Sequence, residues 1–229
     1  MSPEPQRHFH EELSQLKQRL LAVSSEAEDA IGHAVDALLA RNHAGAEAVI
    51  QGDRTINSLE SSVEEQGFRL IALHQPMAKD LRLIFAAIRI VNVLERVGDH
   101  AVNIAQSAER LVEYPHIVPE PEIVEMARLA RQMLADALGA FVRGDAPLAR
   151  DVCRRDDAVD ALNDSVYRIL LTHMMEDPRL IGAGMELLLV SRNLERVADL
   201  ATNIAEDVVF LVEGKTIKHH AEDGRAESP

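Results

Sequence analysis

The chain has 229 residues, a formal charge of −14 and a pI near 5.1. This acidity argues against a nucleic-acid partner, because phosphate backbones are bound by clustered basic residues. The only cysteine, Cys153, excludes an internal disulfide and a cysteine-based zinc site. No secretory signal opens the chain and no run reaches the about 18–20 apolar residues that cross a bilayer, so we expect a cytoplasmic protein without direct membrane insertion.

Apolar residues recur at steps of three and four along most of the chain, which is the period of helices with one buried face. Aromatic residues make up only 3% and tryptophan is absent, a composition that favours helices packed on helices over sheets. The expected helices span about residues 8–41, 46–75, 78–113, 122–142, 147–176 and 178–213. The sequence therefore predicts an all-α protein with six helices.

Prolines mark the boundaries between these helices. Pro76 ends the second helix, and Pro178 follows an N-capping Asp177 at the start of the sixth. Three prolines between Tyr114 and Pro121 form a semi-rigid connection in the middle of the chain. We therefore expect one bundle over 1–117, a second over 118–214, and a mobile tail over 215–229.

An internal repeat relates the two halves. The segment Leu94–Ala105 recurs one hundred residues later as Leu194–Ala205, with nine of twelve positions identical. A second repeat matches the spacing of Asp53 and Asn57 to that of Asp156 and Asp160. Repeated helical segments of this length indicate two tandem, similar three-helix bundles.

The repeated segments carry polar side chains at i, i+4 and i+8, which form one stripe on a helix. The candidate metal ligands are Asp53, Asn57, Glu95, Asp99 and Asn103 in the first half, and Asp156, Asp160, Glu195, Asp199 and Asn203 in the second. Carboxylates four residues apart repel each other unless a cation or a basic group lies between them. Oxygen ligands suit Mg²⁺, Ca²⁺, Mn²⁺ or iron better than copper or zinc.

Two alternatives to a metal site remain open at this point. The carboxylates can form buried structural salt bridges, or they can lie on a solvated face with Arg96 as a local partner. A metal-dependent helical-bundle enzyme using the duplicated ExxxD carboxylates is the alternative function. Di-iron bundles use Glu-x-x-His pairs, however, and Gly98 and Ala198 occupy the histidine positions. We therefore expect no enzyme.

Several motifs resemble the PhoU family, the accessory proteins of phosphate-specific transport. They are Gln75–Ile84, Leu94–Asp99, Met174–Arg179, Asn193–Asp199 and Thr202–Ala205. The resemblance extends from about residue 8 to about residue 215, in the family's order and with both copies present. It implies two three-helix bundles in a bacterial cytoplasmic protein that forms dimers or higher oligomers, and we expect a homodimer.

The resemblance also implies a function. A protein of this family represses the phosphate-starvation response and restrains phosphate uptake. Its implied partners are the ATPase subunit of the phosphate ABC transporter and the phosphate sensor histidine kinase. The implied cofactors are metal ions, whether iron, manganese, magnesium or zinc, on Glu95 with Asp99, on Glu195 with Asp199, and on Asp156 with Asp160. Asn57 departs from the acidic pattern, so we expect a weaker or differently occupied first site.

Overall fold

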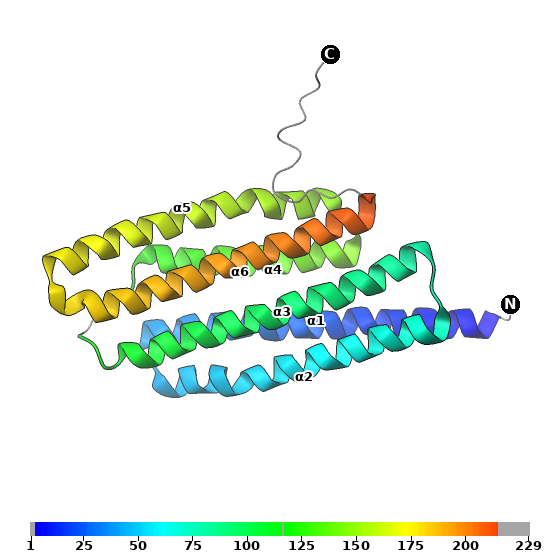
Figure 1. Cartoon of the computed structure of the whole chain (residues 1–229), viewed down its shortest axis with the longest axis horizontal. Coiled ribbons are helices and arrows are strands. Elements are labelled where there is room, and N and C mark those ends of the chain that lie inside the picture. The colour runs from blue at the N-terminus through cyan, green and yellow to red at the C-terminus, as the bar shows by residue number, and fades with distance from the viewer. Residues whose placement is uncertain (1–2, 116, 215–229) are drawn as a thin grey trace, which may run out of the picture.

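The chain folds into long α-helices (Figure 1). The computed structural model describes residues 3–115 and 117–214, and within these it contains no strand. The helices are α1 (Pro3–Ala40), α2 (His43–His74), α3 (Ala78–Leu111), α4 (Pro121–Arg143), α5 (Ala146–Glu176) and α6 (Ile181–Glu213), with a short 3-10 turn at Pro178–Leu180. The all-α prediction with six helices is confirmed. The expected mobile tail, 215–229, lies outside the described residues.

The boundary between α1 and α2 lies earlier than the sequence predicted. Asn42 is the N-cap of α2, and its side chain accepts a hydrogen bond of 3.1 Å from the amide of Gly45. The residues from Asn42 to Gly45 therefore start a helix, whereas we expected them to separate two. At the other end Gln75 adopts a left-handed conformation with φ of 46°, and Pro76 follows it.

Capping side chains also mark the start of α5 and the start of the 3-10 turn that precedes α6. Asp145 accepts a 3.0 Å hydrogen bond from the amide of Leu148 at the start of α5. Asp177 accepts a 3.0 Å hydrogen bond from the amide of Arg179, so it caps the 3-10 turn. The sixth α-helix consequently begins at Ile181, three residues later than expected. None of the described helices is both long and apolar enough to cross a membrane.

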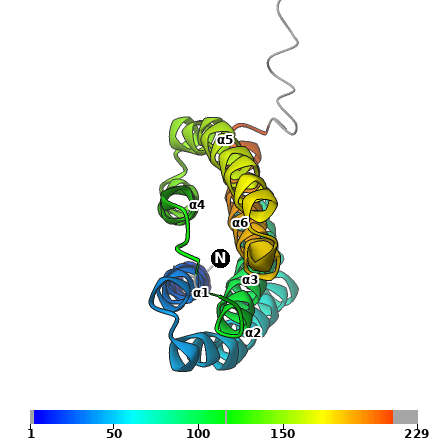
Figure 2. The same ribbon diagram turned by 90° about the vertical axis from the view of Figure 1, so that its left-hand side faces the viewer.

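The helices form two layers (Figure 2). One layer contains α1 and α4, and the other contains α2, α3, α6 and α5, with α3 and α6 in its centre. Two ion pairs show that α3 and α6 run antiparallel. Arg89 lies 3.0 Å from Asp207, and Arg110 lies 2.8 Å from Glu186. The repeated segment of one half therefore packs against the repeated segment of the other.

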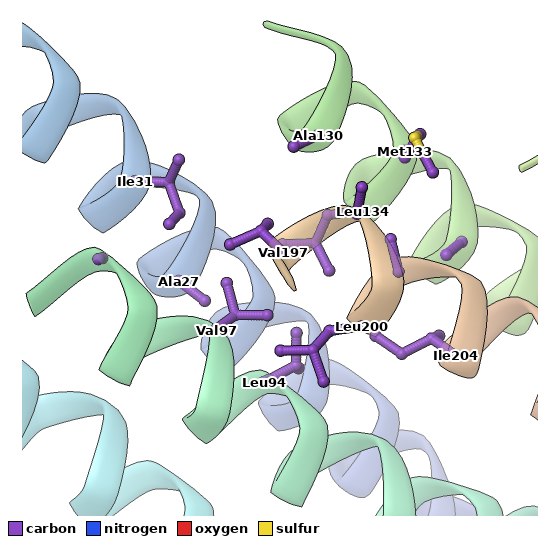
Figure 3. Close-up of a cluster of buried hydrophobic side chains, with 14 of the residues drawn as sticks. Ala27, Ile31, Leu94, Val97, Ala130, Met133, Leu134, Val197, Leu200 and Ile204 are labelled. Atoms are coloured by element: carbon purple, nitrogen blue, oxygen red, sulfur yellow. The ribbon is translucent and has the colours of Figure 1, made fainter. Parts of the chain in front are cut away.

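The buried apolar side chains form one continuous core through both halves. Figure 3 shows the part where the halves meet, with Leu94, Val97, Val197 and Leu200 gathered between α3 and α6. Ala27 and Ile31 of α1 and the side chains of Ala130, Met133 and Leu134 of α4 close this region from the other layer. The division into two domains at 1–117 and 118–214 stays a prediction.

Candidate metal-binding site

The first carboxylate stripe lies between α2 and α3. These helices are neighbours, and Asn92 Nδ2 donates a 2.8 Å hydrogen bond to Glu64 Oε1. Further along, a Cβ added to Gly98 would lie 3.1 Å from Asp53 Oδ1. The absence of a side chain at Gly98 therefore gives Asp53 room to approach α3.

Two buried oxygens of this stripe lack a partner. Asn57 Nδ2 donates a 2.9 Å hydrogen bond to Asp53 Oδ2, while Asp53 Oδ1 and Asn57 Oδ1 are buried without a hydrogen bond among the described atoms. Burial raises the pKa of the Glu95 carboxyl, and the nearby charges of Asp99, Glu60 and Asp53 raise it further. The structure thus brings Asp53, Asn57, Glu95 and Asp99 to one site, where the carboxylates repel each other.

Glu60 also belongs to this site, and our sequence analysis missed it. Burial and the charges of Glu64 and Asp99 raise its pKa. Its position, seven residues after Asp53, places it on the same face of α2 and could have indicated its role. We selected candidate ligands by their presence in both halves, and Glu60 did not qualify because the matching residue in the second half is Asn163.

The second stripe lies between α5 and α6. Burial raises the pKa of Asp156 from an ordinary value of 3.8 to about 7, and the charges of Asp160 and Asp199 contribute. Asp160 also has a raised pKa, because of burial and then the charge of Asp199. Asp156 Oδ1 and Glu195 Oε2 are buried and accept no hydrogen bond among the described atoms. All four predicted carboxylates therefore act on one another across the two helices.

Arginines distinguish the second stripe from the first. Arg192 lies 2.8 Å from Glu195 Oε1, and Arg196 lies 3.1 Å from Asp199 Oδ2. The salt-bridge alternative thus describes part of the second stripe. In the first half Asn92 replaces Arg192, and neither Glu95 nor Asp99 forms an ion pair within the described ranges. Arg192 and Arg196 thus neutralise part of the negative charge of the second stripe. In the first stripe no such ion pair offsets the charges of Glu95 and Asp99 among the described residues.

The two asparagines at the end of the stripes lie apart from the other ligands. A step of four residues turns about 40° around a helix, so a stripe drifts outward as it continues. Asn103 and Asn203 are both exposed. Asn203 lines a groove of about 370 Å³ between α3 and α6, together with Arg89 and Glu206. The structure does not bring these asparagines to the carboxylates, and their role as ligands stays a prediction.

The remaining side chains fit a hard cation by chemistry. They offer carboxylate and amide oxygens, and four of these oxygens are buried without a hydrogen bond among the described atoms. Burial, and then the charges of neighbouring carboxylates, raises the pKa of Glu95, Asp156, Asp160 and Glu195, and a positive ion would favour their charged forms. In the described ranges no three His, Cys, Asp or Glu side chains converge closely enough to hold an ion as they stand. Ion binding therefore requires carboxylates of the two helices to turn toward each other.

Comparison with known proteins shows the family of the chain. The family model described as "PhoU domain" matches residues 20–108 and again residues 123–208. The chain belongs to the PhoU family. Each of the two matches covers one of the repeated units, so the internal repeat corresponds to two copies of the family's domain.

Relatives resemble the chain over almost its whole length. The PhoU homolog of Aquifex aeolicus, a phosphate-specific transport system accessory protein, is 41% identical over 91% of this chain and 94% of its own. The homolog of Caulobacter vibrioides is 40% identical over 92% of both chains.

Solved structures show the same architecture. The crystal structure of PhoU from Pseudomonas aeruginosa matches with a TM-score of 0.85 and 38% identity, over 90% of this chain and all of that one. The phosphate transport system regulatory protein PhoU from Streptococcus pneumoniae matches with a TM-score of 0.84 and 31% identity, over 91% of this chain and 98% of that one. The family and the fold expected from the sequence are therefore confirmed.

Proposed function

We propose that this chain regulates phosphate transport in the cytoplasm, as a negative regulator of phosphate uptake and of the phosphate-starvation response. The observation that carries the proposal is the family match over both halves. It is supported by relatives named as accessory proteins of phosphate-specific transport, which this chain matches over nine tenths of their length or more. A solved relative is described as a regulatory protein of phosphate transport.

The regulator acts in this proposal as an adaptor. It binds the ATPase subunit of the phosphate ABC transporter and the phosphate sensor histidine kinase, and it forms a homodimer. An acidic surface suits partners with basic patches, and it gives the chain no attraction to anionic lipid. Contact with the transporter therefore depends on protein surfaces. Co-purification of the chain with each isolated partner, in the presence and absence of phosphate, tests the adaptor role.

Metal ions belong to the proposed adaptor as structural cofactors. In the first half the proposed ligands are Asp53, Asn57, Glu60, Glu95 and Asp99. In the second half they are Asp156, Asp160, Glu195 and Asp199. A divalent or trivalent cation supplies positive charge that neutralises each stripe. The chain's own contribution is to hold the carboxylates on two packed helices, so that loss of the ion restores their repulsion.

Elemental mass spectrometry on untagged protein tests the metal proposal. We expect one or more ions per half in the wild type and loss of them in the variant Glu95→Gln, Asp99→Asn, Glu195→Gln, Asp199→Asn. The matched control changes four exposed carboxylates outside the stripes: Glu26→Gln, Asp29→Asn, Asp36→Asn and Glu47→Gln. Equal metal content in all three proteins contradicts the proposal.

We propose no catalytic role for the stripes. The family is one of accessory proteins, which supports this view. Turnover of a phosphate ester or of peroxide that disappears in Asp199→Asn would revive the enzyme alternative.

A further inference from the structure

Two rows of exposed apolar side chains lie at the end of the second half where α5 turns into α6. On α5 they are Tyr167, Leu171 and Met175, and on α6 they are Ile181, Met185 and Leu189. Each row follows the spacing i, i+4, i+8, so each forms a stripe along its helix. The six side chains are between 41% and 78% exposed, which is unusual for neighbouring large apolar residues on one face.

Contacts between the helices show that the two rows lie alongside each other. Ser191 Oγ donates a 2.5 Å hydrogen bond to Asn163 Oδ1. Eleven residues further along α5, Met174 packs against α6, and a Cβ on Gly184 would lie 2.9 Å from its Sδ. Between these two contacts Tyr167 is about level with Leu189, and Leu171 is about level with Met185. Figures 1 and 2 show this end of α5 and α6 side by side.

In the first half charged residues interrupt the equivalent surface, although Phe68 and Phe85 are exposed there at 57% and 51%. The matching residues, from the repeat offsets of 103 and 100, are Glu64, Phe68, Ala72, Leu81, Phe85 and Arg89. Glu64 thus occupies the position that matches Tyr167, and Arg89 occupies the position that matches Leu189. Glu64 accepts a hydrogen bond from Asn92, and Arg89 pairs with Asp207. The continuous apolar face is therefore not a general consequence of packing two such helices together.

Carboxylates border the α5 row at both ends, while Arg192 follows Leu189 on α6 and pairs with Glu195. Asp160 and Asp164 continue the α5 row in one direction, and Glu176 follows Met175 in the other. None of the three forms an ion pair within the described ranges. A partner that covers the apolar rows therefore meets negative charge at its flanks, which favours basic side chains there.

We propose that the α5–α6 face, defined by these six apolar residues, binds an amphipathic helix of a partner protein whose apolar side is flanked by Lys or Arg. Each row extends over nine residues, or eight steps of about 1.5 Å and about 12 Å in all, which corresponds to two to three turns of a bound helix. A second copy of this chain is the weaker occupant, because it brings the same acidic border and a formal charge of −14. The inference does not depend on the phosphate-regulatory role, and Asp164 and Glu176 of its acidic border are not among the proposed metal ligands.

The test uses the full chain and two labelled synthetic helices. One peptide has leucines on one side and lysines at the flanks, and the other has glutamates in place of the lysines. We expect fluorescence anisotropy to show binding of the lysine peptide, and binding at least about tenfold weaker for the glutamate peptide. The double variant Leu171→Glu, Leu189→Glu should bind the lysine peptide about tenfold more weakly than the wild type, or more weakly still.

Two leucines on α1 provide the matched control. Leu21 and Leu39 are 41% and 42% exposed, like Leu171 at 41% and Leu189 at 46%. Leu21→Glu with Leu39→Glu should change peptide affinity by less than about twofold, and circular dichroism should show that both double variants remain folded. Equal weakening by the two variants, or no binding of the lysine peptide, overturns the proposal. A wild-type dimer in light scattering that Leu171→Glu with Leu189→Glu dissociates would assign the face to a second copy and also overturn it.

Discussion

The Cδ1 atom of Ile56 lies only 2.9 Å from the place that a Cβ on Gly98 would occupy. The corresponding pair in the second half is Val159 and Ala198, both fully buried. One half therefore combines the larger aliphatic side chain with glycine, and the other combines the smaller one with alanine. The Gly98 position lies next to Asp53, and Val159 follows Asp156 by three residues on α5.

This exchange predicts strong coupling between Gly98 and Ile56. Gly98→Ala alone gains about 1 kcal/mol of helix propensity but forces a buried side chain to move, which costs about 1–3 kcal/mol. We expect a net loss of up to about 2 kcal/mol in urea unfolding. The double variant with Ile56→Val copies the second half and should regain the loss. Additive effects of the two substitutions would contradict this account.

The raised pKa of Asp156 predicts how stability depends on pH in metal-free protein. The native carboxyl binds its proton more tightly than the unfolded one, whose pKa is near 3.8, while the native value is about 7. Its favourable contribution is therefore complete below the unfolded pKa and is lost as pH rises through about 7. In EDTA, Asp156→Asn should stabilise the protein by about 1–2 kcal/mol at pH 8. This value is smaller than the full pKa shift would give, because solvent screens part of the effect.

Denaturant unfolding in EDTA at several pH values measures this difference. The advantage of Asp156→Asn should grow between about pH 4 and pH 7 and level off above. The neighbouring exposed Asp157→Asn serves as control, with an expected change within about 0.5 kcal/mol. A gain that stays constant over the whole pH range would refute the ionisation argument.

The buried carboxylate of Glu12 has a lowered pKa, so we predict the opposite pH dependence for it. Glu12 is 8% exposed and accepts hydrogen bonds from His74 Nε2 at 2.8 Å and Arg69 Nη2 at 2.9 Å. The hydrogen bond with His74 is the main reason why the pKa of Glu12 is lowered. Its stabilisation is present above the unfolded pKa and is lost as pH falls through the lower native value.

Glu12→Gln should therefore cost about 1–3 kcal/mol at pH 7, because charge-assisted hydrogen bonds are weakened. The cost should shrink in acid below about pH 4. Glu11 is adjacent and exposed, and it pairs with Arg7 at 3.1 Å, so Glu11→Gln should cost less than about 0.5 kcal/mol. Thermal unfolding of both variants over a pH series makes the comparison. Equal costs for the two variants would contradict the stabilising role of the hydrogen bonds that Glu12 accepts.

The shared core predicts that the two halves unfold together. Val97 and Val197 are fully buried where α3 packs against α6 (Figure 3). Val97→Ala should remove about 1–2 kcal/mol and lower the urea midpoint of the whole chain. Hydrogen exchange should then speed up in α5 as well as in α2. Faster exchange confined to α1, α2 and α3 would instead support the division into separate domains.

Much of the fold was predictable because helical periodicity and proline positions are local signals. The six helices and the stop at Pro76 could be recognised from the sequence, and so could the capping role of Asp177, although it caps the 3-10 turn before α6. The start of α2 was misplaced because Asn42 and Gly45 suit both a break and a helix N-terminus. The antiparallel contact between α3 and α6 could not be predicted, since periodicity shows which face is buried and not what covers it.

The candidate site was predictable where two helices contribute equivalent residues to both halves. The repeat identified Asp53, Glu95 and Asp99 together with their counterparts, and the structure brings these carboxylates together. It could not identify Glu60, which one half alone carries. The ion pair of Glu195 also depends on an unrepeated residue, Arg192, whose counterpart in the first half is Asn92.

The antiparallel packing of α3 on α6 gives the chain the internal geometry of a homodimer whose two subunits have been joined end to end. In a true homodimer every substitution is imposed on both subunits, so an exposed apolar face would always come in pairs. Joining the subunits in one polypeptide removes that constraint. Leu189 could replace a charged residue in one half while Arg89 kept its ion pair with Asp207 in the other. Covalent linkage thus allows a symmetric scaffold to present two different surfaces.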